Sequence, residues 1–208
     1  MFITLEGPEG SGKSTQIPRL VERLRSGGYN VLALREPGGT FISDAVRRIL
    51  LDFGSGNIDA RSELLLYCAS RAQLVAEKIR PHLAGGGMVV CDRYADSTLA
   101  YQGYGRGLDI QVLRTILGFA THGISPDLTL LLDLDVSTGL GRKSNLEEWN
   151  RLDAESIGFH RRVRAGYLEL AAQEPGRWKV IDAAQPIESV GDDIQRAIQT
   201  RLEMPQPD

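Results

Sequence analysis

The chain has 208 residues, of which 25% are charged and 42% are hydrophobic, as is typical of a globular protein with a full hydrophobic core. Its formal net charge of −3 argues against a basic surface for nucleic acid, and no apolar run is long enough to span a membrane. The chain enters a predicted strand at once, so we expect no signal peptide. The two cysteines, Cys68 and Cys91, lack metal-ligand spacing, and we expect reduced thiols in a cytoplasmic protein.

Five short segments have the pattern of strands, and helical periodicity fills the intervals between them. The predicted strands are Phe2–Glu6, Asn30–Leu34, Met88–Cys91, Leu128–Leu132 and Trp178–Ile181. The clearest helical stretches are Arg61–Leu83, Ile110–Thr121, Ala154–Gln173 and Ile187–Leu202. This alternation predicts an α/β fold, a doubly wound parallel sheet that binds ligands beyond the carboxyl ends of its strands. We expect residues 1–208 to form a single domain, with a disordered tail at about 204–208.

The most informative motif is Gly7–Ser14, which fits the pattern G-x-x-x-x-G-K-[ST] between a predicted strand and a predicted helix. Such a turn points several backbone N–H groups at one spot, where the helix dipole also favours phosphate. In this arrangement Lys13 reaches the β- and γ-phosphates of a nucleoside triphosphate, and the Ser14 hydroxyl binds Mg²⁺. The residues predicted to hold the triphosphate are Gly7, Pro8, Glu9, Gly10, Ser11, Gly12, Lys13, Ser14 and Thr15.

Charged residues stand where the other predicted strands end. Arg35 and Glu36 follow the second strand, and Asp92 and Arg93 follow the third. Because parallel strands end at one rim of the sheet, these groups suit a site for a second phosphate and a magnesium ion. Asp92 is placed to hold Mg²⁺ or its water, and Arg93 to bind an acceptor phosphate through two hydrogen bonds. For each residue taken singly, a solvated surface charge is an equally weighted alternative.

Two further groups of residues suit recognition of a base and a sugar. Ser97–Gly105 combines hydroxyls, an amide and aromatic rings. Tyr67 and Arg71 lie four residues apart on one face of a predicted helix, where they would sandwich and hydrogen-bond a planar base. For this pair the sequence alone favours the alternative, a half-buried tyrosine beside a surface arginine.

The polar segment Gly141–Arg151 carries three cations and lacks strand periodicity. One interpretation is a lid, at about 141–152, that closes over the triphosphate and excludes water, as phosphoryl transfer requires. The other is an ordinary surface loop. The residue pattern does not decide between them.

Together these motifs resemble the bacterial thymidylate kinase family. The resemblance rests on the phosphate loop, on Arg35–Thr40 (REPGGT), on Asp92–Tyr94 (DRY) and on Ser97–Gly103 (STLAYQG), and it extends from Phe2 to about Ile187. It implies a P-loop NTPase fold of three layers with a five-stranded parallel sheet. It also implies that the protein phosphorylates dTMP to dTDP with ATP and Mg²⁺ in dTTP synthesis, as a cytoplasmic homodimer.

The resemblance also implies roles for single residues. Glu9 matches the acid that contacts the 3′-hydroxyl of dTMP, and Arg93 the arginine that binds its phosphate. Tyr67 matches an aromatic position stacked on thymine, Arg71 an arginine that hydrogen-bonds the base, and Tyr101 a tyrosine packed near C2′ of the sugar. The full set implied to contact dTMP is Glu9, Glu36, Pro37, Tyr67, Arg71, Arg93, Ser97, Thr98, Tyr101 and Gln102.

One subclass of the family carries a catalytic arginine just after the acid of the phosphate loop, and another supplies it from the lid. This chain has Gly10 at the loop position, so the resemblance implies a lid arginine. Arg142 and Arg151 are the candidates, with Arg151 preferred, and Lys143 is a weaker choice. Arg142 and Arg151 join Lys13 and Arg93 as the expected catalytic residues. The lid departs from the family pattern, because Leu146–Trp149 adds acidic and bulky side chains.

Two alternatives remain open. A kinase for another nucleotide or a deoxynucleoside would use the same scaffold, because the fold does not fix the acceptor. A nucleotide-driven switch is the alternative from a different class. A GTP switch would need an N-K-x-D element, and the chain contains none.

Overall fold

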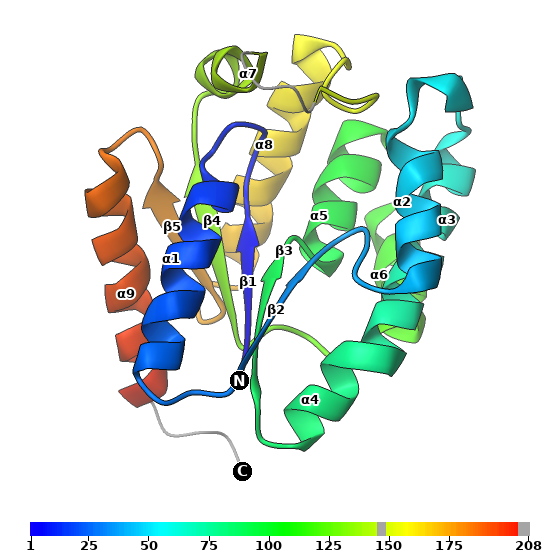
Figure 1. Ribbon diagram of the computed structural model, residues 1–208. Coiled ribbons are helices and arrows are strands. Elements are labelled where there is room, and N and C mark those ends of the chain that lie inside the picture. Colours follow the sequence, from blue (N-terminus) through cyan, green and yellow to red (C-terminus); the bar gives the residue numbers. More distant parts are fainter. Residues whose placement is uncertain (145–148, 204–208) are drawn as a thin grey trace.

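The computed structural model describes residues 1–144 and 149–203 and shows a sheet between two layers of helices (Figure 1). The strands are β1 (Phe2–Glu6), β2 (Val31–Arg35), β3 (Met88–Asp92), β4 (Leu128–Asp133) and β5 (Trp178–Asp182). They lie in the order β2-β3-β1-β4-β5, and every neighbouring pair is parallel. The predicted fold class, α/β with a five-stranded parallel sheet, is confirmed. Because β1 lies at the centre of the sheet, the loop that follows it opens onto both halves of the rim.

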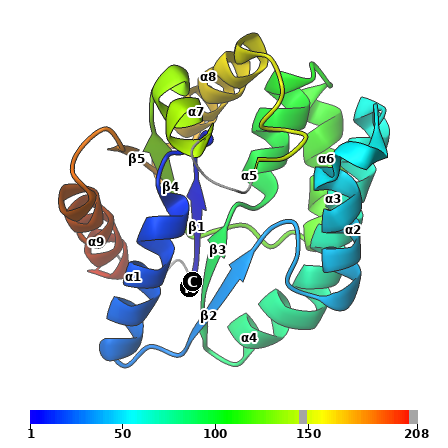
Figure 2. The same ribbon diagram turned by 45° about the horizontal axis from the view of Figure 1, so that its top comes forward.

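Two groups of helices cover the sheet. Contacts place α1 and α9 on one face, and α3, α6 and α8 on the other (Figures 1 and 2). The described helices are α1 (Lys13–Ser26), α2 (Phe41–Leu51), α3 (Ala60–Leu74), α4 (Arg80–Ala84), α5 (Ala95–Thr98), α6 (Ile110–Thr121), α7 (Val136–Ser144), α8 (Ile157–Gln173) and α9 (Ile187–Glu203). A 3-10 turn, η1 (Phe53–Ser55), and two π-helical segments, η2 (Val75–Ile79) and η3 (Leu99–Gly105), complete them.

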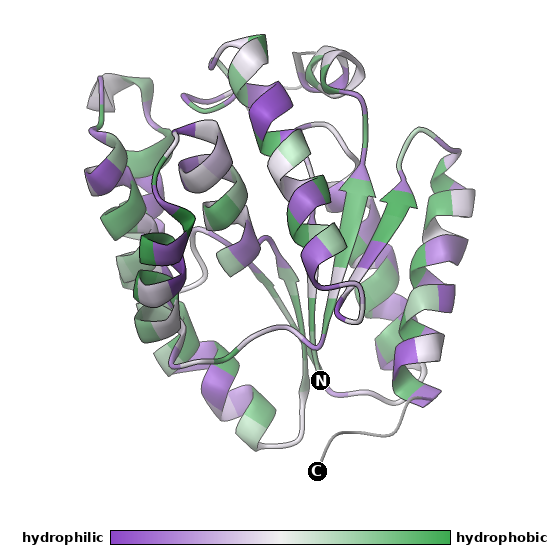
Figure 3. Cartoon of the chain, turned by 180° about the vertical axis from the view of Figure 1, so that it is seen from behind, coloured by the Kyte–Doolittle hydropathy of each residue, from purple (hydrophilic) through white to green (hydrophobic). Residues whose placement is uncertain are grey.

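The strands supply the middle of the hydrophobic core. Successive strand residues point to opposite faces, so Leu130 and Leu132 pack toward α1 and α9, while Leu131 packs toward α6 and α8. All three side chains are fully buried. Figure 3 shows the strands as apolar elements between helices of mixed hydropathy. A core on both faces fixes the sheet as a rigid platform for the loops at its carboxyl edge.

The predicted strands are confirmed, and no strand end differs by more than one residue from its prediction. The predicted helical stretch Arg61–Leu83 is helical throughout, and the π-helical segment η2 joins α3 to α4 within it. Pro81, which follows η2, has no N–H for the regular i−4 bond, and a widened turn before it accommodates that loss. The helix predicted from Ala154 begins at Ile157 instead, because the Ser156 hydroxyl accepts a hydrogen bond from the Phe159 N–H and caps it.

The sequence pattern did not single out α2, whose apolar residues Phe41, Ile42 and Ile49 are exposed. Its start is set by Thr40, whose hydroxyl accepts from the Ser43 N–H at 3.1 Å. Of the predicted lid, Gly141–Ser144 is the last turn of α7, and residues 145–148 lie outside the described residues, as does the predicted tail 204–208. No described helix combines the length and apolarity needed to cross a membrane.

Candidate active site

The phosphate loop joins the carboxyl end of β1 to the first turn of α1. Gly7, Gly10 and Gly12 have φ values of 141°, 68° and 93°, which side chains larger than glycine rarely adopt. Gly12 caps α1 without a side-chain hydrogen bond, so the first N–H groups of the helix point at the loop. This is the geometry that binds phosphate.

Gly10 also faces Gly139 of α7. A Cβ atom built on Gly10 would overlap the Gly139 carbonyl, and one built on Gly139 would overlap the Glu9 carbonyl. The two backbones therefore touch at position 10, where the resemblance implies a catalytic arginine in the subclass that carries it in the phosphate loop. An arginine at position 10 has no room unless α7 moves away.

The side chain of Lys13 lies inside the loop. Its Nζ donates to the carbonyl oxygens of Gly7 and Pro8, both at 3.0 Å, and to the Ser11 hydroxyl at 3.2 Å. Burial, followed by the nearby charge of Arg93, lowers the pKa of Lys13 to about 8. A phosphate beside this ammonium group would stabilise its charged form.

Two cavities meet at the phosphate loop. The β3-side cavity has a volume of about 370 Å³, and the β5-side cavity about 400 Å³. Both contain Gly10, Ser11, Gly12 and Ser14. The β3-side cavity is also lined by Glu9, Lys13, Arg35, Glu36, Pro37, Arg47, Leu51, Asp92, Arg93, Tyr101, Lys143, Asn150 and Leu152. The β5-side cavity is also lined by Thr15, Gln16, Arg142, Ala183, Gln185, Ile187 and Val190.

A carboxylate at the centre of the β3-side cavity organises its cations. Glu9 accepts hydrogen bonds from the Tyr101 hydroxyl at 2.6 Å and from Arg93 at 3.1 Å, and Lys143 Nζ lies 3.5 Å from its other oxygen. Burial alone would raise the pKa of Glu9, but the charges of Arg93, Lys143 and Lys13 outweigh burial and hold that pKa far below its usual range. Glu9 is therefore a fixed negative charge and a hydrogen-bond acceptor.

Arg93 occupies an unusual backbone conformation directly after β3. Its φ of 66° lies in the left-handed region, and its N–H donates to the Leu5 carbonyl at 3.0 Å. The guanidinium stands 5.0 Å from the centre of the Tyr101 ring. A non-glycine residue keeps this strained backbone only where its surroundings over-determine it, which is common at functional sites.

The predicted magnesium ligands also line the β3-side cavity. Ser14 is exposed at the start of α1, and Asp92 ends β3. One oxygen of Asp92, Oδ1, is buried and has no hydrogen-bond partner among the described residues. A buried carboxylate oxygen without a donor is costly, and a divalent cation or its water would satisfy it. The residues present therefore fit a magnesium site.

The residues expected to read the base lie beside this cavity, and most are buried. Arg71 is 1% exposed, so the alternative of a surface arginine is excluded. It donates to Glu36 at 2.7 Å, to the Thr98 hydroxyl at 3.0 Å and to the Tyr94 carbonyl at 3.0 Å. Tyr67 is half-buried, which agrees with the other part of that alternative, a half-buried tyrosine. The second Glu36 oxygen, Oε1, is buried and accepts no hydrogen bond from the described residues.

Gln102 reveals a carboxylate that sequence reasoning missed. Its amide donates to Glu63 at 2.9 Å, and Glu63 also accepts from Arg106 at 3.1 Å and from Arg151. The Glu63 side chain is completely buried. In the sequence of a helix, a single glutamate that is buried looks the same as one that is solvated. No local feature therefore identifies Glu63 as a buried carboxylate.

The three cations of the predicted lid lie in three different places. Arg142 lines the β5-side cavity and donates to the Ala183 carbonyl at 3.3 Å. Lys143 lines the β3-side cavity, where its Nζ lies 2.7 Å from Asp153. Arg151 pairs with Glu63 and donates to the Leu50 carbonyl at 3.0 Å, and it is not among the described residues that line either cavity. The preferred lid arginine is thus bound to α3, away from the phosphate loop.

Several lining residues were not predicted. Arg47 and Leu51 come from α2, and their side chains reach the cavity only because α2 packs beside α3. Ala183 and Gln185 follow the carboxyl end of β5. The rule that ligands bind beyond strand ends would have found the latter pair had it been applied to the fifth strand.

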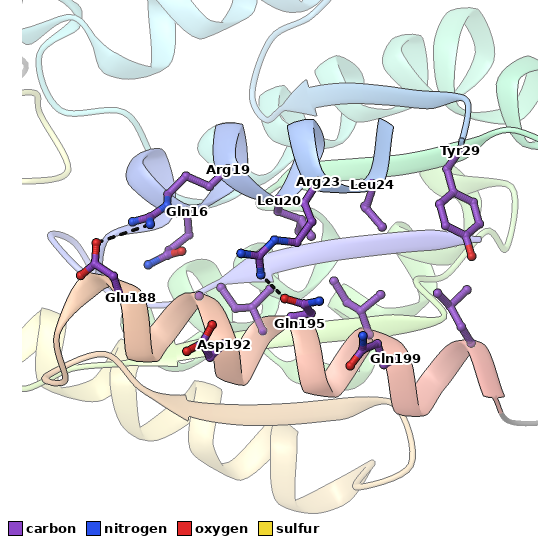
Figure 4. A pocket seen from close by; sticks show the side chains of 14 residues that line it. Gln16, Arg19, Leu20, Arg23, Leu24, Tyr29, Glu188, Asp192, Gln195 and Gln199 are labelled. Atoms are coloured by element: carbon purple, nitrogen blue, oxygen red, sulfur yellow. Dashed lines mark hydrogen bonds and ion pairs between the residues drawn. The ribbon is translucent and has the colours of Figure 1, made fainter. Parts of the chain in front are cut away.

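A further cavity, of about 470 Å³, lies between α1 and α9 (Figure 4). It has an apolar floor that includes Leu20 and Leu24, and Arg19 pairs with Glu188 across its rim at 3.4 Å. It shares only Gln16 with the β5-side cavity. Since it contains no residue from a strand end or from the phosphate loop, we assign the site to the two cavities at the loop.

Comparison with known proteins agrees with this geometry. A family profile described as thymidylate kinase matches residues 5–194. The chain belongs to the thymidylate kinase family. A thymidylate kinase of Roseiflexus sp. (strain RS-1) is 50% identical and covers 97% of this chain and 95% of its own length, and one of Deinococcus radiodurans is 51% identical with 97% coverage of both.

A solved structure shows the same fold. The crystal structure of thymidylate kinase from Ehrlichia chaffeensis superposes with a TM-score of 0.79 at 36% identity, covering 96% of this chain and 98% of that one. The match confirms the predicted P-loop NTPase fold of the thymidylate kinase family. The range 5–194 that the family profile matches includes both cavities and the helix α8.

Proposed function

We propose that this chain transfers the γ-phosphoryl group of ATP to dTMP, with Mg²⁺, and so produces dTDP for dTTP synthesis in the cytoplasm. The observation that carries the proposal is one cavity lined by Lys13 of the phosphate loop and Arg93 at the end of β3, with Glu9 near both charges. A donor phosphate at Lys13 and an acceptor phosphate at Arg93 would be neighbours. The thymidylate kinases of Roseiflexus and Deinococcus support dTMP as the acceptor.

The reaction needs no strong general base. The acceptor is already an anionic phosphate, so catalysis consists of positioning and charge neutralisation. We assign the β3-side cavity to dTMP and the reacting phosphates, and the β5-side cavity, with Ala183 and Gln185, to the remainder of ATP. Ser14 and Asp92 would hold Mg²⁺, which when bound neutralises charge on the phosphate oxygens.

We assign recognition of the nucleoside to the residues around Tyr101. The Tyr101 hydroxyl and the Glu9 carboxylate are 2.6 Å apart, which places an acceptor for a 3′-hydroxyl beside a ring that would pack against the sugar. Tyr67, half-buried on α3, would stack on the base. Arg71 and Gln102 are each held by a buried carboxylate. Gln102 would present its amide oxygen to the base, and Arg71 the N–H bonds that Glu36, Thr98 and Tyr94 do not use.

For the cation that meets the transferred phosphoryl group, we propose Lys143 in place of Arg151. Two of its three N–H bonds are directed by Asp153 and Glu9, and the third remains for a phosphate oxygen. Arg142, beside Ala183, is assigned to ATP binding. This revises the order of candidates that the sequence suggested, because Glu63 binds the Arg151 guanidinium.

We also propose a homodimer. Exposed apolar side chains gather on three helices of one side of the molecule, among them Phe41 (87% exposed), Leu65 (58%), Val112 (53%) and Phe119 (88%). A second copy of this chain would cover them. We expect Phe119→Asp to give a monomer in analytical ultracentrifugation while Val180→Asp, on the edge strand β5, leaves the dimer intact. Equal sedimentation of the two variants would contradict this interface.

The decisive experiment measures ADP release from ATP and Mg²⁺ with dTMP, dUMP, dCMP, dGMP and thymidine as separate acceptors. We expect a fast rate with dTMP, a slower one with dUMP and background rates with the others. A fast rate confined to another acceptor would identify a different nucleotide or deoxynucleoside kinase. ADP release that ignores the acceptor would mean an ATPase, and the roles given to Arg93, Tyr67 and Arg71 would be wrong.

A further inference from the structure

A buried polar network lies directly behind Arg93. It consists of Glu6, the last residue of β1, Ser97 on α5 and Tyr167 on α8. Glu6 and Tyr167 are fully buried and Ser97 is 8% exposed. None of the three lines either cavity at the phosphate loop, so contact with a substrate does not explain them.

Hydrogen bonds join the three side chains to one another and to the backbone. Glu6 Oε1 accepts from the Tyr94 N–H at 2.8 Å, and Glu6 Oε2 accepts from Ser97 Oγ at 2.6 Å and Tyr167 Oη at 2.9 Å. Ser97 Oγ and Tyr167 Oη also lie 2.8 Å apart, and either can be the donor. Each hydroxyl hydrogen therefore points to Glu6 or to the other hydroxyl, and both oxygens keep a lone pair for a further donor.

Those lone pairs face Arg93. Its Nη1 donates to Tyr167 Oη at 3.0 Å and to Ser97 Oγ at 3.3 Å, while Nη2 points to Glu9 at 3.1 Å in the cavity. One edge of the guanidinium is thus held from behind by two oriented hydroxyls. The other edge is presented to the place where an acceptor phosphate would bind.

We propose that Glu6, Ser97 and Tyr167 form a positioning relay, in which the Glu6 carboxyl group orients two hydroxyls that fix the Arg93 guanidinium for the acceptor's phosphate. The inference deepens the proposed function and rests on it, since the ligand of Arg93 is the dTMP phosphate. Ser97 was expected to contact the substrate, and the relay places it behind Arg93 instead. Tyr167 and Glu6, which no motif indicated, become positioning residues.

The relay does not require one charge state of Glu6. The three contacts among Glu6 Oε2, Ser97 Oγ and Tyr167 Oη have room for three hydrogens, of which the two hydroxyls supply two. A proton on Glu6 would supply the third, and neither hydroxyl would then turn its hydrogen toward Arg93. Burial and the neighbouring Asp96 raise the pKa of Glu6, while Arg93 and the two hydroxyls lower it, with a result of about 7.

The test compares Tyr167→Phe with the wild-type enzyme in steady-state kinetics. We expect the KM for dTMP to rise roughly 10-fold, as for loss of one hydrogen bond to a charged group, with kcat and the KM for ATP changed less than about 3-fold. Tyr104→Phe, on the neighbouring segment η3, removes a hydroxyl that does not contact Arg93 and should leave all three constants unchanged.

A second variant checks that the effect belongs to the relay and not to a local defect of Tyr167→Phe. Ser97→Ala, a smaller change, should reproduce the dTMP effect if Tyr167→Phe does not fold.

Two outcomes would overturn the relay. They are an unchanged KM for dTMP in Tyr167→Phe and Ser97→Ala, or an equal loss in kcat and both KM values. Failure of the proposed function looks different, because the wild-type enzyme itself would then release no ADP in response to dTMP.

Discussion

Two clusters of the molecule have the same composition and opposite surroundings. At Glu9, one carboxylate faces the cations of Arg93 and Lys143, and all three side chains line the β3-side cavity with exposed fractions of 13–17%. At Glu63, one carboxylate faces the cations of Arg106 and Arg151, and the Glu63 side chain is completely buried. The first cluster is open to a ligand, whereas the second is closed by protein.

The difference shows what separates a binding group from a structural one. In each cluster one cation also pairs with a second carboxylate, Lys143 with Asp153 at 2.7 Å and Arg106 with Glu155 at 2.6 Å. At Glu9 the other cation, Arg93, lines a cavity where phosphate can bind it. At Glu63 the other cation, Arg151, donates to the Leu50 carbonyl instead. Residue type and charge therefore do not predict the role, whereas the position relative to the cavity does.

The largest effect should come from removing the closed carboxylate. Glu63→Ala leaves two partly buried arginines without their partner, and we expect a loss of about 3–5 kcal/mol of unfolding free energy. Glu9→Ala should cost far less stability, because water can solvate its cations through the cavity. Urea unfolding of both variants measures the difference. Equal losses would break the comparison between the two clusters.

A second test uses Glu6, whose hydrogen-bond partners are a backbone N–H and two hydroxyls rather than cations. Its pKa rises from 4.5 to about 7 on folding, so between these values the folded state holds more protons than the unfolded state. Stability should therefore fall as the pH rises through this window, by about 3 kcal/mol from this group.

Chemical unfolding from pH 4.5 to 8 measures that contribution as the difference between the wild-type protein and Glu6→Gln. The stability of the wild-type protein should decline relative to the variant as the pH rises toward 7 and then run parallel. Parallel curves over the whole range would show that Glu6 is ionised in the folded state at all of these pH values, with no raised pKa.

The third test asks which lid cation belongs to the open cluster. Lys143→Ala should lower kcat by about 100-fold, or about 2.7 kcal/mol of activation free energy, and Lys143→Arg should restore part of it. Arg151→Ala should keep kcat within about 5-fold and lose stability instead. The opposite result, with turnover lost only in Arg151→Ala, would return the role to the arginine that the sequence favoured.

Local chemistry determined much of the protein by itself. Gly7, Gly10 and Gly12 with Lys13 predict a phosphate loop because a tight turn before a helix needs positive φ values and free N–H groups, both of which are properties of neighbouring residues. Continuous apolar runs such as Met88–Cys91 predict strands buried on both faces. The motifs Arg35–Thr40 and Asp92–Tyr94 then indicated the family, which the comparisons confirmed.

Only the tertiary structure decided how charges far apart in sequence pair with one another. Arg151 meets Glu63 across 88 residues, Arg93 meets Tyr167 across 74, and Tyr167 meets Glu6 across 161. A charge pattern cannot reveal such contacts, because an arginine or glutamate that is solvated and one that is buried in a pair have the same local sequence. Burial and partner depend on which helix packs on which strand, and that is settled only when the whole chain folds.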